Sequence, residues 1–473
     1  MKDFFVHKPE KTGASDPVLY YVLAAAGIIF LYMTLGRYAQ TVYDGFLVVP
    51  CLLFLGAIRE PGTGRDLRNV LLLPAAMMVW FLLLQIRRGS AYDELYNAGL
   101  FLSAYLFAFP MASMLRDGDA QKALKIFAGA YLAAAAVLAA EGALLVLDCL
   151  PGFLSEDVCW DGARLQMVWH PNIAGCFLMI GIILGTGFVS QARSRWAKLG
   201  LCAVIALILG AMALTNCRTA ILLTGGYLGS LLFFRAVKHG RIWFLLGVLS
   251  VLVVTAAVYL GAGRLYQANQ ELLIRKYTQQ YSQQLQGDSQ EETLPIKIDA
   301  ETGEVRLTSG SPQGGLEKDF GTLNSRTQIW SSALLALRES RALQIWGIGN
   351  PGWYVSQYNA FEIKHLHNAW MECLVGMGFV GFAIAAAFTL ITLWNSLIIL
   401  LKHHQDIWKR TVALLVLCLM AASMLEPYLF YTTSKYHLVD FLFFLCAGYL
   451  VCWQQEDNRR ILAAVRGRIP FLK

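Results

Sequence analysis

The sequence is poor in charge: only 15% of its 473 residues are Asp, Glu, Lys or Arg, whereas 57% are hydrophobic. Soluble domains carry about 25% charged residues, so this deficit excludes an ordinary soluble protein. None of the ten cysteines has a Cys-x-x-Cys spacing, and the usual pattern of a structural zinc site is therefore absent. The mean hydropathy of +0.50 indicates a polytopic membrane protein instead.

A spanning helix needs about 20 mostly apolar residues, because hydrocarbon cannot satisfy the backbone and a helix does so internally. We expect an all-α fold with about twelve such helices. The expected spans lie near residues 18–36, 41–58, 69–86, 95–115, 123–147, 171–191, 198–214, 219–236, 242–262, 368–400, 411–430 and 437–454. The first lacks a small-residue cleavage site, so we expect a retained span and not a signal peptide.

Lysines and arginines of the short connections gather on alternate loops, which predicts that both termini are cytoplasmic. The few basic residues left on the outer side include Arg164 and Arg218. This topology divides the chain into a membrane domain at residues 1–262, a large extracytoplasmic loop at 263–366 between spans nine and ten, and a second membrane domain with a cytoplasmic tail at 367–473.

The large loop has its own structural signals. Residues 264–286 and 325–346 have helical apolar spacing, and the second of these helices should stop at Gly347. Alternation around residues 300–303 predicts a β-hairpin at about 294–308. Cys149 and Cys159 share a shorter outer loop, where a structural disulfide is one possibility.

The outer face holds the candidate functional residues. Arg218, at the start of the eighth span, either anchors a helix end or binds an anionic group such as a lipid phosphate. Arg164 precedes the sixth span, which Pro171 should open, so that His170 and Asn172 lie at a helix N-terminus where an anion can bind.

Two further candidates flank the end of the large loop. Arg326 begins the loop's last helix and is either solvated or part of the same anion site. Asn368 can cap the tenth span, which puts His367 at the positive end of a helix dipole and favours a neutral, proton-accepting imidazole. A metal pair with His365 is the other interpretation of His367, although no third ligand is evident.

Four motifs in order resemble the O-antigen ligase and polymerase superfamily of membrane glycosyltransferases. They are RLQMVWHPNIAG, LTNCRTAILL, SRTQIW with LQIWGIGNPGW, and HNAWMECLVGMGFVG, all within residues 164–381. Cys217 stands where serine is common in that family. The resemblance implies a GT-C-like architecture and an active site on the extracytoplasmic side of the bacterial cytoplasmic membrane.

The resemblance also implies a reaction. Such enzymes move a glycan from an undecaprenyl-pyrophosphate donor to a hydroxyl of a glycan or glycolipid acceptor, with inversion and without metal or other cofactor; no nucleic acid takes part. His367, Arg218 and Arg326 would then be catalytic. Arg164, Asn172, Asn368 and Glu372 would bind substrate. Whether the enzyme is a ligase or a polymerase stays open.

The alternative function is a transporter or flippase for an anionic lipid-linked saccharide, in which the same arginines only bind. Transporters of this kind have inverted repeats, interrupted helices and charges near the bilayer midplane. The sequence has no detectable internal repeat, and its carboxylates Glu372 and Glu426 fall close enough to the outer ends of spans to share a cavity with His367. We therefore expect an enzyme.

Overall fold

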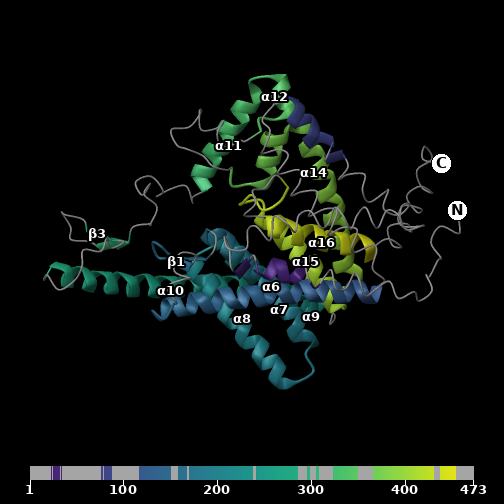
Figure 1. The fold of residues 1–473 in the computed structure, drawn as a ribbon. Coiled ribbons are helices and arrows are strands. Elements are labelled where there is room, and N and C mark those ends of the chain that lie inside the picture. Colours follow the sequence, from purple (N-terminus) through teal and green to yellow (C-terminus); the bar gives the residue numbers. More distant parts are fainter. Residues whose placement is uncertain are drawn as a thin grey trace.

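The structure is a computed structural model. It describes residues 23–34 and 76–87 apart from 24, 32 and 78, together with 117–150, 158–167, 170–237, 241–285, 296–298, 305–307, 323–349, 366–430 and 437–453. This part of the chain is mostly helical, as predicted, and contains two small antiparallel hairpins (Figure 1).

Within these residues, six helices are long and apolar enough to cross a membrane. They lie in α6 (Asp117–Val146), α7 (Pro171–Gln191), α8 (Arg195–Thr215), α9 (Arg218–Ala236), α10 (Arg241–Leu285) and α14 (Ala369–Lys402). They correspond in order to the fifth to tenth predicted spans. Residues 23–34 and 76–87 are helical inside the first and third predicted spans, whereas 41–58 and 95–115 lie outside the described residues.

The eleventh predicted span, 411–430, is wrong in its bounds. The helix there is α15 (Ile407–Ala422), and residues 423–430 form turns before α16 (His437–Trp453). Pro427 supplies the physical reason, because a proline has no amide hydrogen and disfavours helical backbone in the residue before it. The turn leaves Glu426 at a helix end, not inside a span.

The ninth predicted span is longer than expected. α10 has 45 residues and includes the helix predicted separately at 264–286, so residue 262 is not a helix end. Glycines 261 and 263 weaken a helix without stopping it. The predicted hairpin is confirmed as β3 (Ile296–Ile298) and β4 (Val305–Leu307), antiparallel with residue 296 opposite 307, and it lies beside α10.

A second hairpin was not predicted. β1 (Val158–Asp161) pairs with β2 (Arg164–Met167) across a two-residue turn in which Gly162 has φ +62°. Glycine at the first position of a two-residue loop is typical of such a turn, and the strands are too short for their alternation to stand out. No disulfide joins Cys149 and Cys159.

The last helix predicted for the large loop is two helices. α11 (Leu323–Arg338) and α12 (Arg341–Trp346) are separated by two residues, and the Ser340 side chain caps α12 by accepting from the amide of Leu343. α12 ends at Gly347, as predicted. Both helices pack at one end of α14, the green elements at the top of Figure 1.

α14 is broken at Gly378, whose φ of 70° and ψ of −175° are not helical. Gly347 meets this break with φ 73°. A Cβ on Gly378 would lie 2.2 Å from the carbonyl oxygen of Ile345, and one on Gly347 would lie 2.4 Å from the amide nitrogen of Gly378. Only glycine fits both the dihedral angles and the spacing, so the glycine pair joins α12 to α14.

Carbonyl groups at the break find partners outside α14. The amides of Ile348 and Gly349 donate to the carbonyls of Val375 (2.7 Å) and Gly376 (3.1 Å). An unpaired backbone group is costly in an apolar environment, so these bonds stabilise the break.

Helix 76–87 supports the same junction. The indole nitrogen of Trp80 donates to the carbonyl of Met377 (2.8 Å), and its ring stacks on Trp346 of α12 with centroids 4.8 Å apart. The Arg87 guanidinium lies 5.0 Å from the centroid of Trp346. A predicted membrane helix, α12 and α14 therefore meet at one point.

We expect Gly378→Ala to destabilise the protein by about 3 kcal/mol, because alanine is strained at this φ and its methyl group would collide with backbone. Thermal unfolding of the purified protein measures this. Gly200→Ala is the matched control, since nothing lies within 4 Å of a Cβ at that helical position of α8. An equal loss of stability in both variants would contradict the assignment.

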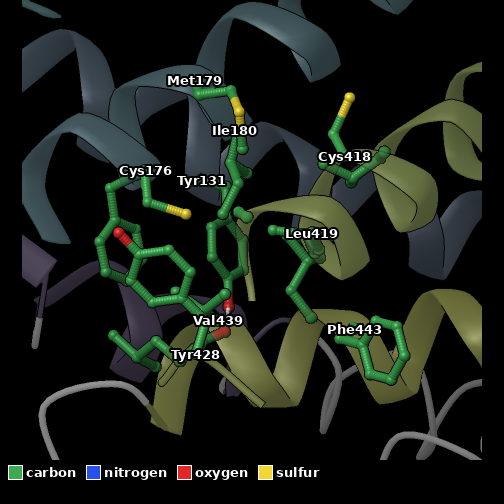
Figure 2. Packing of buried hydrophobic residues seen from close by; sticks show 14 of the residues in the cluster. Tyr131, Cys176, Met179, Ile180, Cys418, Leu419, Tyr428, Val439 and Phe443 are labelled. Atoms are coloured by element: carbon green, nitrogen blue, oxygen red, sulfur yellow. Dashed lines mark hydrogen bonds between the residues drawn. The ribbon is translucent and has the colours of Figure 1, made fainter. Parts of the chain in front are cut away.

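One hydrophobic core joins α6, α7, α15 and α16, and Figure 2 shows side chains from these helices in contact. Two buried tyrosines anchor it. Tyr131 donates its hydroxyl hydrogen to the carbonyl of Leu438 (2.6 Å), and Tyr428 donates to the carbonyl of Asn172 (2.9 Å). Tyr428 lies two residues after Glu426, so the core fixes the turn that carries this carboxylate.

Candidate functional site

The site is built around the carboxylate of Glu426, whose side chain is only 4% exposed. One oxygen, Oε1, accepts hydrogen bonds from Asn172 Nδ2 (2.8 Å) and Arg326 Nη2 (3.1 Å). The other, Oε2, lies 3.2 Å from His367 Nδ1. Residues from α7, from α11 and from the start of α14 thus meet on one carboxylate of the turn after α15.

Asn172 is placed by the start of α7. Pro171 is the first helical residue, as predicted, and His170 is the N-cap, with Nδ1 accepting from the amide of Asn172 (3.3 Å). Arg164, the first residue of β2, donates from Nη2 to Asn172 Oδ1 (2.5 Å) and from Nε to the carbonyl of Thr215 (3.0 Å). The unpredicted hairpin therefore delivers Arg164 to the site.

Arg326 is placed by the first turns of α11. Its side chain is 12% exposed and donates from Nη1 to the carbonyl of Leu425 (2.7 Å), in addition to its ion pair with Glu426. The interpretation of Arg326 as a merely solvated residue is therefore wrong. Its charge is balanced by a buried carboxylate, which sequence reasoning did not anticipate.

Asn368 caps α14, as predicted. Its Oδ1 accepts from the amides of Trp370 (2.9 Å) and Met371 (3.0 Å), and its Nδ2 donates to the carbonyl of Met424 (2.8 Å). Oδ1 thus caps α14, and Nδ2 ties the cap to the turn after α15. His367 directly precedes Asn368, with 23% of its side chain exposed. His365 lies outside the described residues.

Glu372 lies on the buried side of the same turn. Its side chain is buried, and Oε1 accepts from the amide of Leu366 (2.5 Å). The Glu372 carboxylate therefore binds the main chain one residue before His367.

Arg218 is the exposed first residue of α9, and no described residue forms a hydrogen bond or ion pair with its guanidinium. Tyr266 of α10 lies near Arg218, Arg164 and the Asn216 side chain. Tyr266 was missed because it belongs to the part of α10 that was assigned to a separate loop helix.

Cys217 precedes Arg218 and is buried. Burial raises the pKa of its thiol to about 11, so the thiol is protonated near neutral pH and is a poor nucleophile. Its sulfur lies 3.6 Å from the carbonyl of Asn172, as the donor of a weak hydrogen bond. A serine hydroxyl could make the same contact, so Cys217 suits a packing role.

The charges near the site are unequal. Arg164, Arg218 and Arg326 supply three cations. Asp161 lies opposite Arg164 in the hairpin of β1 and β2, and Glu426 is the described carboxylate that forms an ion pair with one of the three arginines. Arg326 is paired with it. Arg164 donates to a neutral amide and a carbonyl, and neither Arg164 nor Arg218 forms an ion pair with a described carboxylate. Such a site favours an anionic ligand.

Comparison with known proteins agrees with this chemistry. The sequence model of the O-antigen ligase family matches residues 203–386, a segment that includes Arg218, Arg326 and His367 but not Asn172 or Glu426. No curated protein matches the chain. This protein, with six candidate membrane-spanning helices among its described residues, therefore contains a segment, residues 203–386, that matches the O-antigen ligase family.

Proposed function

We propose that the protein transfers a glycan from an undecaprenyl-pyrophosphate-linked donor to an acceptor hydroxyl at the outer face of the bacterial cytoplasmic membrane, with inversion and without a metal. The observation that carries this proposal is the contact between His367 and Glu426, 3.2 Å apart, beside an arginine cluster. This contact places a proton acceptor beside arginines that can bind a phosphate leaving group.

The surroundings of Glu426 determine how His367 can act. Arg326 and Asn172 both donate to the carboxylate, which favours its ionised form. An ionised carboxylate can only accept, so Nδ1 of His367 carries the hydrogen and Nε2 carries the lone pair. Glu426 thus orients the imidazole and stabilises the imidazolium that forms when Nε2 accepts a proton.

In the proposed reaction, the acceptor hydroxyl oxygen attacks the anomeric carbon of the donor sugar. The bond from that carbon to the pyrophosphate oxygen breaks, and the electron pair leaves with the pyrophosphate. His367 Nε2 takes the hydroxyl proton. One displacement of this kind inverts the anomeric configuration, and it serves a terminal acceptor or a growing repeat-unit chain equally well.

The leaving pyrophosphate needs fixed cations. Arg218 and Arg164 are the better candidates, because the charge of Arg326 is already balanced by Glu426. This ordering revises the sequence-based hypothesis, which put Arg326 beside Arg218. We assign Arg326 to the support of Glu426, and Asn172 to the link between Glu426 and Arg164.

Reconstitution tests the proposal. The purified protein is placed in vesicles with an undecaprenyl-pyrophosphate oligosaccharide and several acceptors, and glycosidic products are measured by mass spectrometry. We expect Arg218→Gln to slow transfer by about a hundredfold without loss of stability, because Arg218 is exposed. Arg338→Gln, at an exposed position of α11, should leave the rate unchanged. Donor translocation without any glycosidic product would contradict the proposal and favour a flippase.

A further inference from the structure

His367 has an unusual backbone. Its φ is +51°, in the left-handed region that residues other than glycine rarely adopt. Such a conformation costs free energy and persists only where neighbouring contacts enforce it. Because the direction of the imidazole depends on this backbone, whatever holds the turn also sets the distance from Nδ1 to Glu426.

The peptide units next to His367 are held from two sides. The amide of Leu366 donates to Glu372 Oε1 (2.5 Å), and the carbonyl of Leu366 accepts from the indole nitrogen of Trp330 (2.8 Å). Leu366 itself is fully buried. The amide and the carbonyl of Leu366 are therefore both bound to side chains, one from the first turn of α14 and one from α11. Leu366 directly precedes His367, the residue with left-handed backbone.

The donor to the carbonyl comes from α11. Trp330 follows Arg326 by one helical turn, so both side chains leave the same face of the helix. Arg326 binds Glu426, while Trp330 binds the chain beside His367. Ile329 and Leu366 belong to one buried cluster that packs this helix against the start of α14.

We propose that Trp330 and Glu372 are positioning residues for the base. They bind the carbonyl and the amide of Leu366, and so stabilise the left-handed backbone of His367 that places Nδ1 next to Glu426. This inference rests on the proposed function, in which His367 accepts the proton. It replaces the sequence-based expectation that Glu372 binds substrate. Neither residue needs to touch donor or acceptor.

Conservative variants separate the two bonds. Trp330→Phe keeps an aromatic ring and loses the indole hydrogen, whereas Glu372→Leu loses the acceptor and Glu372→Gln keeps one. We expect kcat for glycan transfer to fall about tenfold in Trp330→Phe and Glu372→Leu, with donor KM within about twofold of wild type. Glu372→Gln should restore most of the rate. Trp394→Phe, at an exposed tryptophan of α14 (51% exposed), is the matched control.

A double-variant series distinguishes positioning from general destabilisation. In a His367→Asn background, Trp330→Phe and Glu372→Leu should lower the residual rate no further, because their effect passes through the missing imidazole. A further tenfold loss in that background would overturn the inference and leave the proposed function intact. A His367→Asn protein of full activity would overturn both.

Hydrogen exchange provides a readout that is independent of catalysis. In wild type the amide of Leu366 is buried and bonded to Glu372, so it should exchange slowly. Glu372→Leu should accelerate exchange at residues 366–369 and leave the second half of α14 unchanged. Unchanged exchange at residues 366–369 in this variant would overturn the inference.

Discussion

His367→Asn is expected to slow glycan transfer by about a thousandfold in a protein that still folds. Asparagine tolerates left-handed backbone, and its amide can donate to Glu426 in place of Nδ1. It has no ring nitrogen that accepts a proton. The change therefore removes the base and keeps the conformation and the hydrogen bond, which is a sharper test than alanine.

Three measurements on His367→Asn check this expectation. Initial rates of product formation give the loss, donor binding shows whether the arginine site is intact, and thermal unfolding shows whether the turn is intact. We expect only the first to change. A rate within tenfold of wild type would show that another group accepts the proton, and a large drop in melting temperature would show that His367 serves the fold.

Glu426→Gln is expected to cost about 3 kcal/mol of folding free energy, because removing one partner leaves a buried charge uncompensated. It should also slow transfer by at least about a hundredfold. The carboxylate takes hydrogen bonds from Asn172 and Arg326 and contacts His367. A glutamine offers one acceptor oxygen and adds an NH₂ group, so at least one buried donor loses its partner and Arg326 loses its counterion.

The matched control is Glu271→Gln on α10. Glu271 forms an exposed pair with Arg275, 4.0 Å apart, with side chains 71% and 84% exposed. Exposed pairs of this kind contribute about 0.5 kcal/mol or less. Chemical denaturation or thermal unfolding compares the two variants. Similar stabilities for Glu426→Gln and wild type would contradict the network described here.

Much of the fold could be predicted because membrane helices leave a strong local signal. The apolar runs predicted α6 to α10 and α14 in order, and the caps at Pro171 and Asn368 follow from short-range rules. The errors lie where local signals compete. At Pro427 an apolar run outweighed a proline, and the end of the apolar run at residue 262 was taken as the end of a helix, whereas α10 continues to Leu285.

The candidate site could be predicted only in part. His367, Arg326, Arg164 and Asn172 do converge, and Glu426 was expected near the same cavity. Its central place was not foreseen, because its three partners, Asn172, Arg326 and His367, are far apart along the chain. Glu372 was located correctly near His367, but its role was not. A carboxylate near the base suggested substrate contact, whereas its bond is to the Leu366 amide.

Composition and hydropathy were enough to establish a multi-pass membrane protein, since burying a backbone in lipid imposes long apolar helices on any sequence. Short motifs were enough to indicate the resemblance to the O-antigen ligase family, whose model matches residues 203–386. The pairing of Arg326 with Glu426, the left-handed His367 and the glycine contact between residues 347 and 378 depended on how distant helices pack. Those interactions are made across space, over separations that no local pattern encodes, and they determine which of the charged residues can act on a substrate.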